Sequence, residues 1–318
     1  VIIMLADAAA LLAKLKKSTT QVNLVVGERA EDFERVAADA TVILSWSTSG
    51  DLLRQVLLMA PRVRWVHNLW AGVDHLPSAE LLESRAVLTN GRGVFSHSLA
   101  EWVIGAIIYF AKDFRRLIRN QMEGRWDPYG VVEVAGQTLG IIGYGDIGRA
   151  VARLAQAMGM HVLGLTRHGL PADEVDGPAK QIFPPEDLIS MIEQSDYVVI
   201  AAPLTRETQG MIGDAQLAAM RSEAILINVG RGPIVREDAL IRALTANRIK
   251  GAALDVFDRE PLPPGHPFYA MENVLMSPHC ADRTADWLDN ALQLFLGNLK
   301  RFLQGDSLLN VVDVGRGY

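Results

Sequence analysis

A glycine-rich turn near the middle of this 318-residue chain constrains the fold most. It has the pattern G-x-G-x-x-G, formed by Gly143, Gly145 and Gly148, between a strand-like apolar run (138–142) and an Ala-rich helical run (150–158). In such a unit the first glycine permits a tight turn, the second lets a pyrophosphate approach the backbone, and the third lets helix and strand pack closely. The N-terminus of the helix also attracts phosphate. A purely structural turn is the alternative. The predicted dinucleotide site consists of Gly143, Tyr144, Gly145, Asp146 and Ile147.

Alternating strand-like and helix-like runs on both sides of this turn predict two α/β domains with parallel sheets. Before the turn, strands are expected at 22–26, 42–44, 63–67 and 86–89, and helices at 8–17, 31–38, 51–59 and 78–84. From the turn onward, six strands are expected at 138–142, 161–165, 197–201, 224–228, 252–255 and 274–276. Six strands separated by helices are what a doubly wound dinucleotide domain requires.

The domain boundaries are expected at two long helices. Ser98 and Glu101 have the spacing of a capping box, which predicts the start of an apolar helix that ends near Phe110. A polar stretch (112–129) follows it, and a second long helical run spans 281–303. We therefore expect a dinucleotide-binding domain at 98–284, inserted into a substrate domain made from 1–97 and 285–318.

Composition excludes several other classes of protein. The formal net charge is -6 and no basic cluster is present, so we expect no nucleic-acid partner. The longest apolar run in the middle of the chain (102–111) has about half the length of a bilayer crossing, so no membrane partner is expected. The single cysteine, Cys280, excludes an intrachain disulfide and a cysteine-based zinc site, and we expect no metal. Without a secretory pattern, the expected location is the cytoplasm.

The residues after the second strand of the cofactor domain bear on which cofactor binds. NAD sites place Asp or Glu there to bind the ribose 2′-hydroxyl. This chain has Thr166, Arg167 and His168, and no acid before Asp173. Arg167 can pair with a 2′-phosphate and Thr166 can donate a hydrogen bond to it. We therefore predict NADP at Thr166, Arg167 and His168; NAD, with Arg167 as a solvated loop residue, stays open.

Three chemically complementary residues follow three later strands. Arg231 comes after 224–228, Glu260 after 252–255 and His279 after 274–276. Because ligands of open α/β sheets bind outside the carboxyl ends of the strands, these residues can converge on one site. A guanidinium binds a carboxylate, and an imidazole exchanges protons near neutral pH. A neighbouring carboxylate fixes the imidazole tautomer and raises its pKa. Each residue alone would more often be an ordinary surface or loop residue.

With these motifs the sequence resembles the D-isomer-specific 2-hydroxyacid dehydrogenases, from about Trp65 to Val312. The segments that match are 69–74, 100–102, 143–148, 202–205 with Thr208, 228–232, 254–257, 260–262 and 277–279. The resemblance implies a Rossmann-type cofactor domain and a flavodoxin-like substrate domain, both doubly wound parallel sheets, flanking a cleft. It also implies a homodimer.

The same resemblance implies the reaction and the roles of residues. The chain would reduce a small 2-keto acid, such as glyoxylate or hydroxypyruvate, to the D-2-hydroxy acid with NADPH. His279 would be the general acid and base, Arg231 would bind and polarise the keto acid, and Glu260 would tune His279. Backbone N–H groups of the Ala71, Gly72 and Val73 loop would hold the substrate carboxylate. Further cofactor contacts would come from Ala202, Pro203, Thr208, Val229 and Asp255, the last at the carboxamide, and Val94, Phe95 and Ser96 would flank the nicotinamide or the substrate.

Several alternatives remain at this point. Residues 280–284 and Trp287 depart from the small residues usual in the family, which leaves the size and polarity of the substrate open. Trp126 would either reach a partner's substrate site or anchor the surface. A formate dehydrogenase-like enzyme would carry Gln at the position of Glu260. A phosphoglycerate dehydrogenase would be expected to carry the regulatory extension often seen in that enzyme. An NAD(P)-sensing corepressor of the same fold would keep all three residues.

Overall fold

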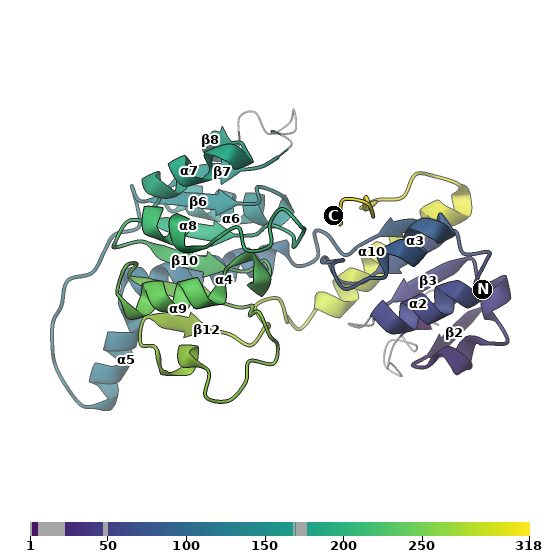
Figure 1. The fold of residues 1–318 in the computed structure, drawn as a ribbon, viewed down its shortest axis with the longest axis horizontal. Helices are drawn as coiled ribbons and strands as arrows, with labels where there is room; N and C mark the ends of the chain where they lie inside the picture. The colour runs from purple at the N-terminus through teal and green to yellow at the C-terminus, as the bar shows by residue number, and fades with distance from the viewer. Residues whose placement is uncertain (1, 6–22, 47–49, 168, 170–176) are drawn as a thin grey trace. The chain divides into compact units, whose positions relative to one another are not determined.

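The computed structural model describes residues 2–5, 23–46, 50–167, 169 and 177–318 (Figure 1). The chain forms two compact units: unit 1 comprises Val1–Phe95 and Thr284–Tyr318, and unit 2 comprises Ser96–Arg283. Each unit is built on its own parallel sheet, so the predicted α/β class is confirmed. The helix predicted at 8–17 lies outside the described residues.

Unit 1 contains a five-stranded parallel sheet in the order β2-β1-β3-β4-β5. The strands are β1 (Ile2–Leu5), β2 (Leu24–Gly27), β3 (Val42–Ser45), β4 (Trp65–Asn68) and β5 (Val87–Thr89). Sequence analysis had not predicted β1. Every residue of β3 and β4 is buried, as expected where both faces of a parallel sheet are covered.

Helices cover both faces of this sheet. α2 (Gly50–Met59) and α3 (Ser78–Ser84) enclose one apolar cluster, which includes Phe33 and Val66. α10 (Trp287–Gln304) belongs to a second cluster, in which Phe295 stacks on Trp65 with ring centroids 5.3 Å apart. α10 begins later than the helical run predicted at 281–303.

The prediction of a helix at 31–38 is wrong. Two short 3₁₀ turns, Ala30–Phe33 and Ala37–Asp39, stand there instead. The Asp32 carboxylate accepts hydrogen bonds from the backbone N–H groups of Glu28 and Arg29, both at 3.0 Å. A short acidic side chain that bonds to nearby backbone in this way competes with the regular helix.

Unit 2 contains a seven-stranded parallel sheet in the order β12-β11-β10-β9-β6-β7-β8. The strands are β6 (Thr138–Ile142), β7 (His161–Leu165), β8 (Ala179–Phe183), β9 (Tyr197–Ile200), β10 (Ile225–Asn228), β11 (Gly251–Leu254) and β12 (Val274–Met276). The strand order reverses between β6 and β9, which defines a doubly wound sheet. The six predicted strands are present, and β8 at the sheet edge was not predicted.

Two helix layers enclose the sheet of unit 2. α4 (Ser96–Ala111) and α6 (Asp146–Ala157) pack against each other, whereas α7 (Leu188–Gln194), α8 (Asp214–Ala219) and α9 (Glu237–Thr245) form a row along the strands (Figure 1). Across the part of the chain that the structure describes, no helix combines the length and apolarity that a bilayer crossing requires.

The capping box predicted at Ser98 and Glu101 is wrong because α4 begins at Ser96. The Ser98 hydroxyl instead donates to the carbonyl oxygen of Ala281, at 2.6 Å. Glu101 pairs with the His97 ring, at 3.1 Å between Oε1 and Nε2. Both residues therefore lie within the helix, and their side chains bond to Ala281 and His97.

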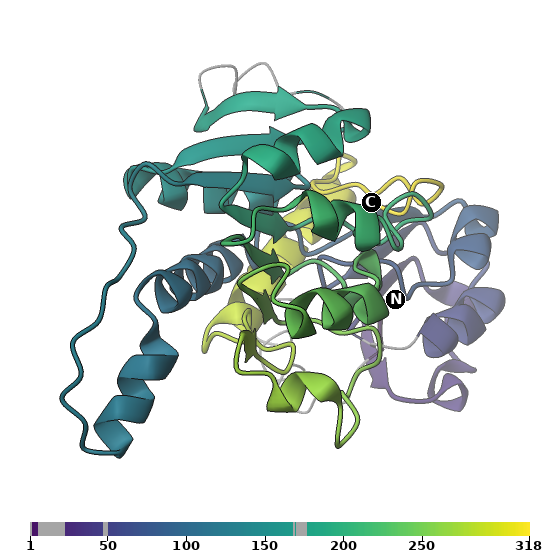
Figure 2. The same ribbon diagram turned by 60° about the vertical axis from the view of Figure 1, so that its left-hand side comes forward.

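An additional helix, α5 (Phe114–Met122), lies in the stretch that sequence analysis treated only as polar. Asp113 caps it by accepting a hydrogen bond from the Arg116 N–H, at 3.3 Å. α5 and the segment that leads from it to β6 extend away from the sheet of unit 2 (Figures 1 and 2). Several of their apolar side chains are exposed, with Met122 at 83% and Trp126 at 95%.

Candidate active site

The glycine turn between β6 and α6 is tightly packed at its first and third glycines and open at its second. A Cβ at Gly143, where φ is +91°, would lie 2.5 Å from the backbone nitrogen of Ala202. A Cβ at Gly148 would lie 2.3 Å from the carbonyl oxygen of Gly143. A Cβ at Gly145 would meet nothing within 4 Å. The open position is where the sequence predicts the approach of a pyrophosphate.

The residues around this turn fit a dinucleotide phosphate. Gly145 is the N-cap of α6, a helix of 12 residues whose first N–H groups follow directly. The N–H groups of Gly143 and Tyr144 donate to the Leu165 carbonyl, at 3.1 and 3.0 Å, which ties the turn to the end of β7. The carboxylate of Asp146, in the first turn of α6, accepts a hydrogen bond from the Ser96 hydroxyl.

The end of β7 presents Thr166 and Arg167; His168 lies outside the described residues. Arg167 Nη2 lies 3.6 Å from Glu207 Oε2, and both side chains are substantially exposed. A hydrogen bond from Thr205, together with the charge of Arg167, holds the pKa of Glu207 below its ordinary value. Sequence analysis did not identify Glu207, because its contact with Arg167 joins two loops that are distant in sequence.

That loop also carries three predicted cofactor contacts. The backbone of Ala202 packs directly against Gly143 and leaves no room there for a side chain. The Thr208 hydroxyl donates to the Pro203 carbonyl, at 2.7 Å, and accepts a hydrogen bond from the Thr205 N–H, at 2.8 Å. Ala202, Pro203 and Thr208 therefore lie together in one closed loop at the carboxyl end of the sheet.

The segment that carries Arg231 is braced by Asn228 and packed against the loop after β11. The Asn228 side chain donates a hydrogen bond to the Arg231 carbonyl and accepts one from the Gly230 N–H, both at 3.0 Å. Val229, the next residue after Asn228, is buried. A Cβ at Gly232 would lie 1.9 Å from the carbonyl carbon of Phe257. Glycine at 232 therefore allows this segment to contact the loop that carries Glu260.

Glu260 and His279 form a direct pair. His279 Nδ1 lies 2.6 Å from Glu260 Oε2, and the other carboxylate oxygen accepts the Phe257 N–H, at 2.9 Å. The Glu260 side chain is 35% exposed and the His279 side chain is 41% exposed, so the pair is accessible to a small ligand. Since Glu260 engages Nδ1, the ring atom that can exchange a proton with a ligand is Nε2.

The charges of this cluster shift both pKa values in the direction that favours the ion pair. The hydrogen bond to Glu260 raises the pKa of His279, although burial and the charge of Arg231 oppose the shift. Burial disfavours ionisation of Glu260, but hydrogen bonds from His279 and Phe257 and the charge of Arg231 bring its pKa below the ordinary value. Arg231, Glu260 and His279 thus act on one another, as their positions after neighbouring strands predicted.

His279 is held in a backbone conformation that residues other than glycine rarely adopt. Its φ is +49°, and its N–H donates to the Asp255 carbonyl, at 2.9 Å. The buried Asp255 carboxylate accepts hydrogen bonds from the Ser277 hydroxyl and from the N–H groups of Cys280 and Ala281, at 2.5, 3.0 and 3.2 Å. Backbone conformations of this kind are enriched at active sites and also occur at helix ends and turns. Asp255 therefore fixes the His279 segment, and its predicted contact with the carboxamide stays a prediction.

Asp282 is a further acid near this cluster to which sequence analysis assigned no role. Burial raises the pKa of its carboxyl, whereas the charge of His279 opposes the shift. Nothing in the spacing of the motifs points to this residue.

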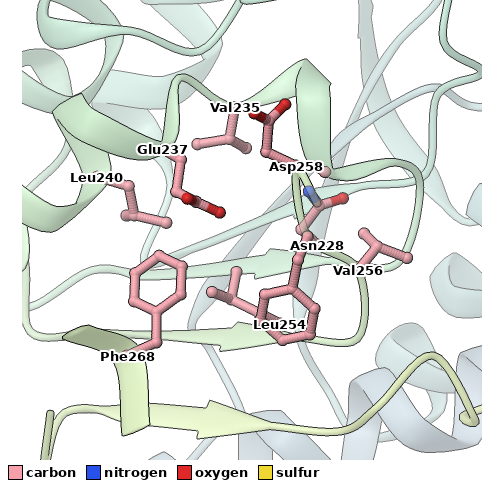
Figure 3. A pocket seen from close by; sticks show the side chains of 10 residues that line it. Asn228, Val235, Glu237, Leu240, Leu254, Val256, Asp258 and Phe268 are labelled. Atoms are coloured by element: carbon pink, nitrogen blue, oxygen red, sulfur yellow. The ribbon is translucent and has the colours of Figure 1, made fainter. Parts of the chain in front are cut away.

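A second histidine–carboxylate pair lies elsewhere in unit 2. His266 Nε2 is 3.0 Å from Glu237 Oε1. Glu237 also lines a small pocket with Leu240, Leu254 and Phe268 (Figure 3). This pocket is lined mostly by apolar side chains and includes none of the three predicted catalytic residues. No group of three or more His, Cys, Asp or Glu side chains suited to a metal ion occurs among the described residues.

The predicted carboxylate loop lies in unit 1, directly after β4. The Asn68 side chain donates to the carbonyl oxygens of Trp70 and Gly72, at 3.0 and 2.9 Å. The Asn90 side chain donates to the Ala71 carbonyl, at 2.6 Å. Sequence analysis did not identify either asparagine, since both act on backbone carbonyl groups, whatever residue carries them.

The predicted residues 94–96 are divided between the two units. The Phe95 ring is buried in unit 1, with its centroid 6.0 Å from that of Trp70 and 6.1 Å from that of Trp287. Val94 packs in the apolar cluster of α10. Ser96 is the first residue of α4 in unit 2.

The family model "D-isomer specific 2-hydroxyacid dehydrogenase, NAD binding domain" matches residues 104–281. A glyoxylate reductase of Korarchaeum cryptofilum is 34% identical over 265 residues, which are 81% of this chain and 79% of that protein. A D-isomer specific 2-hydroxyacid dehydrogenase of Xanthobacter autotrophicus, solved with NADPH and MES, is 29% identical with a TM-score of 0.85 over 100% of both chains. An NADPH-dependent glyoxylate/hydroxypyruvate reductase of Sinorhizobium meliloti, solved with NADP and sulfate, is 26% identical with a TM-score of 0.86 over 100% of this chain and 99% of that one.

Proposed function

This chain belongs to the D-isomer-specific 2-hydroxyacid dehydrogenase family and is a nicotinamide-dependent oxidoreductase, and from that premise we propose that it reduces a small 2-keto acid to the D-2-hydroxy acid with NADPH. The observation that carries the proposal is the contact of 2.6 Å between His279 Nδ1 and Glu260 Oε2, in the field of Arg231. That arrangement provides a proton donor, a group that keeps it protonated and a cation for the substrate.

A reduced nicotinamide cofactor, held through its phosphates at the glycine turn before α6, would supply the hydride for the keto carbon. His279 then gives its Nε2 proton to the carbonyl oxygen, and Glu260 stabilises the imidazolium until that transfer. Arg231 binds the keto acid and stabilises the negative charge that develops on the carbonyl oxygen. In the reverse direction His279 accepts the proton of the hydroxyl group.

Arg167 supports NADPH over NADH. Its guanidinium stands at the end of β7, where the ribose of the adenosine half is expected, and it is exposed enough to meet a 2′-phosphate. Glu207, at 3.6 Å, is the group from which Arg167 would turn away on binding. The two solved relatives that carry NADPH or NADP are consistent with this choice.

Replacing Arg167 with Ala is expected to raise the dissociation constant of NADPH about 10- to 100-fold. The dissociation constant of NADH should change less than about twofold, because only NADPH loses a charge-assisted hydrogen bond. Glu207→Gln is expected to strengthen NADPH, since it removes a competing carboxylate. Fluorescence titration with each nucleotide measures both effects. Arg221→Ala is the matched control, because Arg221 pairs with Asp196 at the opposite end of β9. Equal losses for NADH and NADPH would contradict the assignment.

Replacing Glu260 with Gln is expected to move the alkaline limb of kcat/KM for keto acid reduction to lower pH. His279 must be protonated to act as an acid, so activity is lost as pH rises through its pKa. Glu260 raises that pKa, and a neutral amide does not. The measurement is a pH–rate profile, with Glu237→Gln, next to His266, as the control. An unmoved limb in Glu260→Gln would disprove the coupling.

Glyoxylate and hydroxypyruvate are the first candidates, because the Korarchaeum and Sinorhizobium relatives carry those names. A panel of 2-keto acids assayed with NADPH and with NADH tests the function directly. Saturable turnover of a short 2-keto acid is the expected result. Nucleotide binding without turnover of any member would favour a cofactor-sensing module instead.

We also propose a cytoplasmic homodimer. Exposed apolar side chains gather on α5 and the segment after it, where Leu117, Ile118, Met122 and Trp126 face solvent. Large apolar side chains that stay exposed on one segment favour its use as an interaction surface. Light scattering of the purified chain measures the assembly, and a monomer at micromolar concentration would contradict it.

A further inference from the structure

Two buried asparagines hold the loop after β4 by its carbonyl groups. Both hydrogen bonds of Asn68, to the Trp70 and Gly72 carbonyls, come from one side-chain nitrogen. Asn90 holds the carbonyl of Ala71, between them. Three successive carbonyl oxygens are therefore fixed by two side-chain amides.

This arrangement determines where the loop directs its N–H groups. In a planar trans peptide, the C=O of one residue and the N–H of the next point in opposite directions. Since Asn68 holds the carbonyls of Trp70 and Gly72, the N–H groups of Ala71 and Val73 both point away from it. Because Asn90 holds the Ala71 carbonyl, the N–H of Gly72 points away from Asn90. Over the described residues, none of these three N–H groups has a backbone acceptor, and successive N–H groups of this kind bind anions.

The packing of the loop supports this orientation. The N–H of Gly91 also donates to the Trp70 carbonyl, at 3.1 Å. A Cβ at Gly91 would lie 2.2 Å from the Leu69 carbonyl oxygen, so this residue must be small for the two segments to meet. The loop is thus fixed from the side of β5 as well as from β4.

Asn68 differs from a buried asparagine with an ordinary structural role. Its side chain is fully buried, and Oδ1 has no hydrogen-bond partner in the structure. Asn298, also fully buried in unit 1, both donates to the Leu309 carbonyl and accepts from the Leu309 N–H, at 3.0 and 2.8 Å. A buried acceptor without a donor destabilises the fold. Asn68 keeps its Oδ1 without a donor, while its side-chain nitrogen holds the loop.

We propose that Asn68 and Asn90 are positioning residues, which aim the N–H groups of residues 71–73 at the carboxylate of the 2-keto acid. The proposal rests on the proposed function, because that function supplies the anion. Neither side chain needs to touch the substrate. Each side chain acts by fixing the peptide planes whose N–H groups contact the substrate carboxylate.

The test uses Asn68→Leu, which keeps most of the volume and removes the donor, and Asn90→Ala, at a site nearer the surface. Oxamate, an unreducible 2-carbonyl carboxylate, is titrated into the NADP-bound protein by calorimetry. Each variant is expected to weaken oxamate about 10- to 100-fold, as loss of hydrogen bonds to a charged group predicts. KM for the best 2-keto acid should rise in parallel while kcat changes little, because the carboxylate is held equally in ground and transition states.

Asn298→Leu is the matched control. It removes a buried asparagine clamp from the same unit and is expected to lower the melting temperature while leaving the dissociation constant of oxamate within about twofold. Unchanged oxamate binding in both Asn68→Leu and Asn90→Ala, or an equal loss in Asn298→Leu, would overturn the proposal while leaving the proposed function intact. A wild-type protein that neither binds oxamate nor reduces any 2-keto acid would overturn the proposed function, and this proposal with it.

Discussion

A His279→Gln variant is expected to lose about 10²- to 10⁴-fold in kcat for 2-keto acid reduction, the usual contribution of a positioned general acid. Glutamine keeps a polar side chain of similar reach beside Glu260 but cannot release a proton near neutral pH. The dissociation constant of NADPH should not change, because His279 belongs to a loop that follows β12 and the glycine turn follows β6. Steady-state kinetics and nucleotide titration measure the two quantities separately.

The chain provides a close control for this substitution. His266 also pairs with a glutamate, Glu237, at 3.0 Å in the same unit. His266→Gln is expected to retain kcat within about threefold, as is usual for substitutions outside a reacting site. Near-normal turnover in His279→Gln, or an equal loss in both variants, would remove His279 from the role of general acid.

An Arg231→Lys variant is expected to lose about 10²- to 10³-fold in kcat/KM, the range found when one donor to a developing oxyanion is removed. Lysine keeps the charge but not the planar fork, so it cannot hold two oxygen atoms in fixed geometry. The loss should fall on both kcat and KM, since Arg231 is proposed to bind the acid and to stabilise the alkoxide. Kinetics with glyoxylate and with hydroxypyruvate measure it.

Arg236→Lys is a suitable control, because Arg236 follows Arg231 closely in sequence but pairs with Asp214 and Asp238 on the surface. Its kinetics should remain near those of the wild type. An Arg231→Lys enzyme with an unchanged KM would leave binding of the keto acid to other groups.

Local patterns predicted the central strands well, because each of these strands is a short apolar run with a helical run before or after it. Edge elements were missed for a physical reason. β8 has mostly exposed or half-buried residues, so it lacks the apolar run that marks a buried strand. α5 is rich in arginine and is held by contacts outside itself, including that of Arg115 Nη1 with the Glu272 carbonyl, at 2.8 Å. Such contacts leave no local trace in the sequence.

The candidate site shows the same division. Arg231, Glu260 and His279 could be found because each follows a strand and all three strands end at one edge of the sheet. Glu207 could not be found, since its contact with Arg167 joins the loops after β9 and β7. Asn68 and Asn90 gave no signal, because hydrogen bonds to backbone carbonyls do not depend on the types of residue that carry them. Sequence analysis thus found residues defined by their own chemistry and missed those defined by their partners.

The two-segment construction of unit 1 has a consequence for how the protein is made. Unit 2 is one continuous stretch of chain, whereas unit 1 needs both Val1–Phe95 and Thr284–Tyr318. α10, in the second of these segments, supplies Phe295 to the stack on Trp65 and Leu292 to the same cluster. During synthesis domains fold as units once their residues have left the ribosome. Unit 2 can therefore complete its core while unit 1, although begun first, still exposes Trp65 and must wait for the synthesis of α10.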